Sequence, residues 1–74
     1  HLCMDGEGKI IIADDNNNLI RLYDPDTKKV STILGGKAKP ATKLNRPHGV
    51  AIAPDGGLWV CDSWNDRVVV LRNY

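Results

Sequence analysis

The sequence predicts an all-β chain, and three observations lead to this fold class. Its apolar residues come in short runs, without the sustained 3.6-residue periodicity of helices. Glycine, proline, aspartate and asparagine separate the runs, and these residue types favour turns. The whole pattern also occurs twice, first from Leu2 and again from Val50, as in proteins built from repeated units.

The apolar runs mark the strands. Most of them contain valine or isoleucine, whose branched side chains favour extended backbone. Seven strands are expected, at Leu2–Met4, Lys9–Ala13, Leu19–Tyr23, Val30–Leu34, Val50–Ala53, Leu58–Cys61 and Val68–Leu71.

Polar clusters between the runs predict the turns. Pro25 fixes φ in one of them, and Asp24 can accept a hydrogen bond from the backbone beside it. The expected turns are Asp5–Gly8, Asp14–Asn18, Asp24–Thr27, Gly35-Gly36, Pro54–Gly57 and Asp62–Asp66.

Sliding the first copy onto the second aligns turns and apolar positions without a gap. This repeat alignment places Asp14 on Asp62 and Asn17 on Asn65, while Leu2, Met4, Ile12 and Ile20 fall on Val50, Ile52, Val60 and Val68. We therefore expect a four-stranded meander at residues 1–35, a connecting loop at 36–47 and a second meander, without its last strand, at 48–74.

Composition excludes several classes of protein. The 74 residues make one small domain at most. The net charge of +1 gives no indication of binding to nucleic acid or to an anionic membrane. The basic cluster Lys37, Lys39 and Lys43 is expected in a solvated loop. No apolar run has the length of a membrane span. The chain begins with His1 and not with Met, so a preceding segment, with any targeting signal, is expected to have been removed or omitted.

The two cysteines do not form a metal site alone. Cys3 and Cys61 each stand in an apolar run, so we expect small, buried hydrophobic residues. A single bridge between them stays open as an alternative.

The stretch from Arg46 to Leu71, RPHGVAIAPDGGLWVCDSWNDRVVVL, resembles an NHL repeat. Its marks are the Pro-x-Gly-Val entry, the Pro-Asp-Gly turn, and Asp-x-x-Asn-x-Arg-Val at residues 62–68. The first copy, GKIIIADDNNNLIRLYDPDTKKVSTILGG, resembles the same repeat, with Leu19 in place of the usual basic residue. The resemblance implies a β-propeller, commonly of six blades. Seven strands make an incomplete ring, so further blades are expected from the same or other chains.

In such a propeller the loop between the blades lies on the same face as the turn between the second and third strands. This face, at the mouth of the channel, is where propellers usually bind ligands. The candidate binding residues on it are Arg46, His48, Asp62, Ser63, Trp64 and Asn65, with Asp14 and Asn17 from the neighbouring blade.

Several of these residues have a structural and a functional interpretation. Asp14 and Asp62 can accept hydrogen bonds within their turns, or several carboxylates can hold a cation such as calcium or a polar ligand. Trp64 can anchor a partner or pack against the adjacent blade. Trp59 is expected in the core between blades, and Arg67 is expected to pair with Asp62 or Asp66.

His48 is the candidate for catalysis or metal binding. The stretch around it resembles peptidyl-hydroxyglycine lyases, propeller enzymes in which histidines from several blades bind zinc. A zinc site needs at least three protein ligands, and His1 could add a second only if one residue were deleted from the first copy. The alternative is a histidine that hydrogen-bonds to a neighbouring loop.

Three functional hypotheses follow. The leading one is a non-catalytic scaffold that binds a protein, peptide or glycan at the channel-mouth face. The others are part of a metal-dependent lyase or hydrolase that uses His48, and a self-assembling propeller unit. Family habit favours an extracytoplasmic location. RNA binding is least favoured because the turns carry Asp and Asn more than Lys or Arg.

Overall fold

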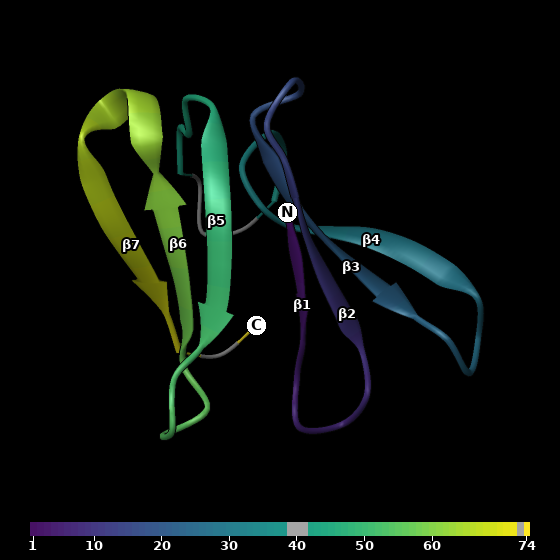
Figure 1. Cartoon of the computed structure of the whole chain (residues 1–74). Coiled ribbons are helices and arrows are strands. Elements are labelled where there is room, and N and C mark those ends of the chain that lie inside the picture. Colours follow the sequence, from purple (N-terminus) through teal and green to yellow (C-terminus); the bar gives the residue numbers. More distant parts are fainter. Residues whose placement is uncertain (39–41, 73) are drawn as a thin grey trace.

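The computed structural model describes residues 1–38, 42–72 and 74, and it consists of two antiparallel β-sheets (Figure 1). The first sheet has the order β1 (Leu2–Met4), β2 (Ile10–Asp14), β3 (Leu19–Asp24) and β4 (Lys29–Leu34). The second has the order β5 (Pro47–Ile52), β6 (Leu58–Asp62) and β7 (Arg67–Leu71), with a short 3-10 turn, η1 (Ser63–Asn65), between β6 and β7. No α-helix occurs in these ranges, so the all-β prediction is confirmed.

The strand bounds differ from expectation mainly at β5. This strand begins at Pro47, before the expected start at Val50, and Pro47 pairs with Asp62. Proline is tolerated at the first residue of a strand because the missing N–H removes no interior ladder bond. A register shift between Pro47 and Gly49 leaves His48 outside the regular pairing. The other strands agree closely with the expected bounds.

The hydrophobic core lies between the two sheets. β5 packs against β1 and β2, and side chains that alternate toward this contact are buried while their neighbours along the strand are not. The buried apolar side chains are Ile11, Ala13, Ile20 and Leu34 from the first sheet, Val50, Leu58 and Val60 from the second, and Leu44 from the segment before β5.

The connection between the sheets depends on a close backbone approach at Gly35. This residue has φ +83°, and a Cβ there would lie 2.5 Å from the carbonyl oxygen of Asn18 and 3.3 Å from Cδ1 of Leu44. Only glycine fits such a position without displacing backbone. Residues 39–41, which include Lys39 of the expected basic cluster, lie outside the described residues.

Cys61, Trp59 and Cys3 are all less buried than the sequence predicts. Cys61 is exposed, and Trp59, 46% exposed, does not lie between the two sheets. Both alternate with the buried Leu58 and Val60, so they lie on the face of the second sheet that points away from the first. Cys3 is partly buried, and burial, followed by the charge of Asp5, raises the pKa of its thiol. Both cysteines are free, so no bridge joins them.

Candidate functional site

Three segments that are distant in sequence meet at one edge of the molecule, the upper edge in Figure 1. They are the β2–β3 turn (residues 15–18), the segment before β5 (residues 42–46) and the β6–β7 turn (residues 63–66). β2 and β6 end at this edge and β5 begins there, so antiparallel pairing brings the three together. We call it the loop edge.

Asp62 organises the second-sheet half of the loop edge. It is fully buried, and its carboxylate accepts hydrogen bonds from the backbone N–H of Asn45 (2.7 Å), Nδ2 of Asn65 (2.8 Å) and Nε of Arg67 (2.7 Å). Burial alone would raise the pKa of Asp62. The three hydrogen bonds and the positive charge of Arg67 outweigh it, so the pKa lies below its ordinary value. Arg67 pairs with Asp62, as predicted.

Asp14 occupies the equivalent place in the first sheet. Its Oδ2 accepts from Nδ2 of Asn17 at 2.9 Å and from Nε of Arg21 at 3.0 Å. The hydrogen bond from Asn17 is the main cause that lowers the pKa of Asp14. Both aspartates therefore hold their own turns together, and each has its carboxylate committed to neighbours in the chain.

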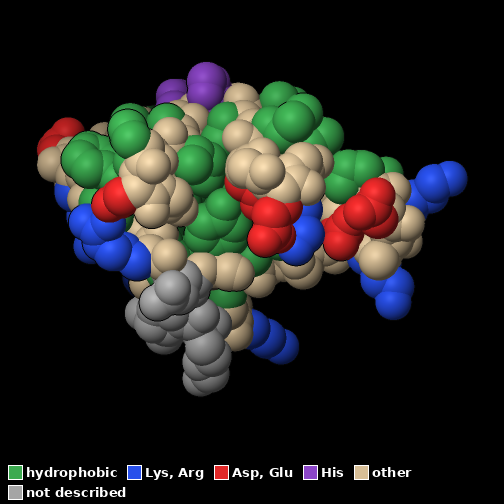
Figure 2. Space-filling view, turned by 90° about the horizontal axis from the view of Figure 1, so that it is seen from below, with side chains coloured by type: hydrophobic (Ala, Val, Ile, Leu, Met, Phe, Trp, Pro, Cys, Tyr) green, Lys and Arg blue, Asp and Glu red, His purple; other side chains and the backbone are tan. Residues whose placement is uncertain are grey.

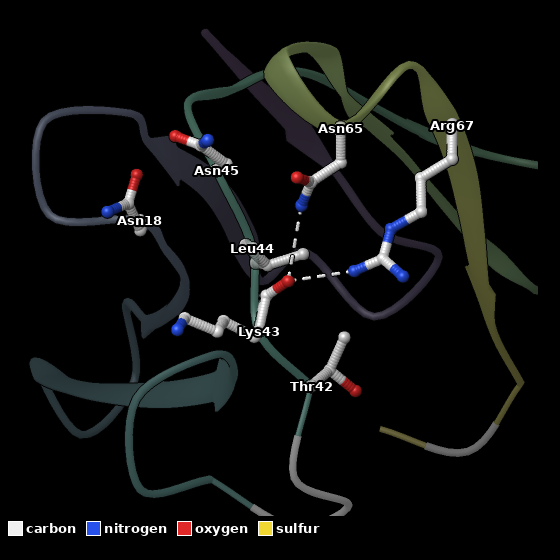
Figure 3. A pocket seen from close by; sticks show the side chains of 7 residues that line it. All are labelled: Asn18, Thr42, Lys43, Leu44, Asn45, Asn65 and Arg67. Atoms are coloured by element: carbon white, nitrogen blue, oxygen red, sulfur yellow. Dashed lines mark hydrogen bonds between the residues drawn. The ribbon is translucent and has the colours of Figure 1, made fainter.

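The backbone carbonyl of Lys43 ties the connecting segment to the second sheet. It accepts hydrogen bonds from Nδ2 of Asn65 at 3.3 Å and from Nη2 of Arg67 at 2.8 Å (Figure 3). Asn65 and Arg67 thus each bridge Asp62 to this carbonyl. The loop edge is held by side chains as well as by strand pairing.

Arg46 joins the two sheets. Its backbone N–H donates to Oδ1 of Asn18 and its Nη1 donates to Oδ1 of Asn16, both at 2.8 Å. Its guanidinium also lies over the indole ring of Trp64, 5.2 Å from the ring centroid. Trp64 is 64% exposed, and its backbone N–H donates to the carbonyl of Asn45 at 3.1 Å. Trp64 therefore stands on the surface with Arg46 against its ring.

His48 contacts the first sheet through Asp15. Its Nε2 lies 3.3 Å from Oδ2 of Asp15, and both side chains are about half exposed. Of the other candidates, the hydroxyl of Ser63 donates to the carbonyl of Cys61, and the backbone carbonyl of His1 accepts from the N–H of Ala13. Among the described residues, no three His, Cys, Asp or Glu side chains lie close enough together to hold a metal ion.

An open hollow of about 820 Å³ lies at the loop edge between the two turns (Figure 3). Its lining carries three amide side chains and two cations but no carboxylate. The lining residues are Asn18, Thr42, Lys43, Leu44, Asn45, Asn65 and Arg67.

Sequence reasoning missed several residues of this edge. Asp15, Asn16 and Asn18 were expected only as members of a turn, yet each contacts a residue before or within β5. One signal was available, because a run of five Asx residues is more than a tight turn requires. The partners of these side chains lie in another blade, far along the chain, and could not be read from the sequence.

Comparison with known proteins identifies the repeat. Residues 44–71 match the family model described as the NHL repeat, and these residues carry β5 to β7 and most of the loop edge. The chain carries an NHL repeat. The two sheets of this NHL chain are blades of a β-propeller, and their seven strands form an incomplete ring in the part of the chain that the structure describes.

Curated relatives extend the NHL similarity over nearly the whole chain. NHL-repeat-containing protein 4 of Mus musculus is 34% identical over 73 residues, which are 99% of this chain and 48% of the relative. Its counterpart in Homo sapiens is 28% identical over 71 residues, 96% of this chain and 52% of the relative. Protein SUPPRESSOR OF QUENCHING 1, chloroplastic, of Arabidopsis thaliana is 37% identical over 75 residues, 90% of this chain and 7% of the relative. The NHL chain thus spans about half the length of the mammalian relatives and a small part of the plant protein.

Within residues 1–38, 42–72 and 74, no helix has the length and hydropathy needed to cross a bilayer.

Proposed function

We propose that the NHL chain is an interaction scaffold whose loop edge binds an acidic segment of a protein partner. The observation that carries this proposal is the guanidinium of Arg46 lying over the exposed indole of Trp64. Tryptophan and arginine are among the residues most enriched as anchors of protein interfaces. Here the two are in contact with each other before any partner binds.

Arg46 differs from the other three arginines because it forms no ion pair within the described residues. Arg21, Arg67 and Arg72 form ion pairs with Asp14, Asp62 and Asp55, respectively. Within the described ranges Arg46 has no carboxylate partner, and its neutral partners are two asparagines and an indole. A carboxylate of a partner would supply the missing charge, and an apolar side chain beside it would cover the indole.

The site is held in place by the backbone on both sides. Asn18 fixes the main chain of Arg46, and the carbonyl of Asn45 fixes that of Trp64. A site that is ordered before binding loses less entropy when a partner arrives. The adjacent hollow adds Lys43 and amide groups that can donate to a partner's main chain.

Selection from displayed random short peptides tests the proposal. The wild-type chain is expected to enrich peptides with Asp or Glu next to a large apolar residue. For a selected peptide, Arg46→Gln and Trp64→Ala should each weaken binding about tenfold or more, as interface anchors commonly do. Lys28→Gln is the matched control, because it removes a positive charge from the exposed β3–β4 turn, away from the loop edge.

Three outcomes would refute the acidic-segment proposal. They are selection of peptides without acidic residues, equal binding by all four proteins, and preferential binding of an oligosaccharide or a single-stranded RNA at Trp64. Added salt should weaken the peptide complex, because the contact to Arg46 is ionic and exposed.

The second candidate is a metal-dependent enzyme, and the pair of His48 and Asp15 favours it. The imidazole nitrogen and the carboxylate oxygen lie 3.3 Å apart, and both are atoms that commonly bind zinc. A third ligand would have to join them. Zinc titration followed by calorimetry tests this candidate. Binding that His48→Ala abolishes would support it, and no heat of binding with the wild-type chain would contradict it.

A further inference from the structure

Among the described residues, most of the exposed large apolar side chains lie on two sheet faces. Across the second sheet, on the side away from the first, lie Ala51, Trp59, Cys61, Val68 and Val70. We call this surface the second outer face. Trp59, Val68 and Val70 are 46%, 55% and 40% exposed, respectively.

The first sheet has a corresponding first outer face, on the side away from the second sheet. It carries Leu2, Met4, Ile10 and Ile12, which alternate along the strands with side chains that face the core. Leu2 and Met4 are 63% and 64% exposed. Figure 2 shows hydrophobic side chains at the surface across the width of the molecule. Such faces are common where proteins associate.

The sequence repeat relates these two faces to the interface that is already formed inside the chain. The repeat alignment places the core-facing side of the first sheet on the second outer face: Cys3, Ile11, Ala13, Ile20 and Leu22 fall on Ala51, Trp59, Cys61, Val68 and Val70. It likewise places the first outer face on the core-facing side of the second sheet: Leu2, Met4, Ile10 and Ile12 fall on Val50, Ile52, Leu58 and Val60.

The two outer faces are therefore equivalent, position by position, to the two surfaces that pack against each other in the core. None of the positions just named carries a charge. Arg21 pairs with Ile12 and so also lies on the first outer face, where it donates to Asp14 of its own sheet. The contact inside the chain shows that surfaces of these two types bury each other, with Ile11, Leu58 and Val60 fully covered.

We propose that a second copy of this chain docks its first outer face onto the second outer face, repeating the packing of the two blades. One copy contributes its first outer face and the other its second outer face. The association is therefore head to tail, and it continues until a ring closes. The argument uses the two sheet faces alone, so it does not depend on peptide binding at the loop edge.

Two charged substitutions, one on each face, test the head-to-tail arrangement. Light scattering should give a mass of two or more chains for the wild-type protein, and of one chain for Met4→Arg and for Trp59→Arg. An equimolar mixture of the two variants should give dimers, because each retains the face that the other has lost. Thr27→Arg, which adds the same charge in the exposed β3–β4 turn, should associate like wild type.

The mixing step separates this proposal from misfolding and from symmetric pairing. Circular dichroism should show the same β-sheet signal for all variants, and a variant that loses it is replaced by Val68→Lys or Leu2→Lys on the same face. A wild-type chain that stays monomeric when concentrated would overturn the proposal. Wild-type dimers combined with no dimers in the mixture would overturn it too.

Discussion

Arg21 and Arg67 make the same bond from different positions in the two blades. Each donates from Nε to the equivalent aspartate, Arg21 to Asp14 at 3.0 Å and Arg67 to Asp62 at 2.7 Å. Yet the repeat alignment places Arg67 on Leu19 and not on Arg21. Leu19 and Arg21 are next-but-one neighbours on β3 and so share a face of the strand, which lets Arg21 reach the same carboxylate.

The exchange of positions can be tested by moving the arginine. Arg21→Leu should lower the free energy of unfolding by about 0.5–1 kcal/mol, since both side chains of the pair are partly exposed to solvent. Adding Leu19→Arg to this variant should restore most of the loss, because the guanidinium returns to the usual position of the repeat. Urea denaturation measures both changes, and an equal loss in the single and double variants would contradict the equivalence of the two arginines.

Asp62 should matter more to stability than any other carboxylate of the loop edge. Asp62→Asn leaves an amide facing the donors of Asn45, Asn65 and Arg67, so the free energy of unfolding should fall by about 2–4 kcal/mol. Asp66→Asn is the matched control, because Asp66 is exposed and its left-handed φ of 53° also suits asparagine. Denaturant midpoints that fall equally in the two variants would show that the buried network is not the source of stability.

Stability should decline in acid. Asp14 and Asp62 have pKa values below those of the unfolded chain, where an aspartate titrates near about pH 3.9. Their ionised forms therefore stabilise the fold fully above about pH 5, and this contribution is lost as the pH falls through the folded-state pKa values. Denaturation between about pH 3 and pH 7 measures the effect, and Asp62→Asn should make the slope below about pH 5 shallower. A wild-type stability that is unchanged across this range would contradict the role of these carboxylates.

Gly35 should tolerate substitution less well than Gly8. Both have a positive φ, +83° and +84°, so alanine costs about 1–2 kcal/mol of backbone strain at either position. At Gly35 the new Cβ also meets the carbonyl of Asn18, whereas at Gly8 no atom lies within 4 Å. Thermal denaturation should therefore show a clearly larger loss for Gly35→Ala, and equal losses would mean that the two turns do not approach as described.

The sequence contained most of the information for the fold but less for the site. Strand alternation and Asx-rich turns place the strands closely, except at β5, where the bulge at His48 hides the pairing of Pro47 with Asp62. Alternation shows which residues share a face, but not which face is covered, and for this reason Trp59 and Cys61 were assigned to the core. The Asp-x-x-Asn pattern indicated the turn that Asp62 holds, because that contact is local.

The contacts across the blades join residues that are far apart in the sequence, so the sequence did not predict them. Asn16 and Asn18 bind Arg46 because the loop edge folds back on itself, and nothing in a polar turn specifies a partner so far along the chain. In the same way, the contact between Arg46 and Trp64 depends on two loops that meet only when β5 pairs with β6.

Packing of the two blades through one shared core is the claim on which the other arguments depend. Methyl-methyl nuclear Overhauser effects in a chain with labelled isoleucine, leucine and valine test it most directly. Contacts are expected between the methyl groups of Ile11 on β2 and Val50 on β5. Contacts confined to residues within each sheet would contradict it.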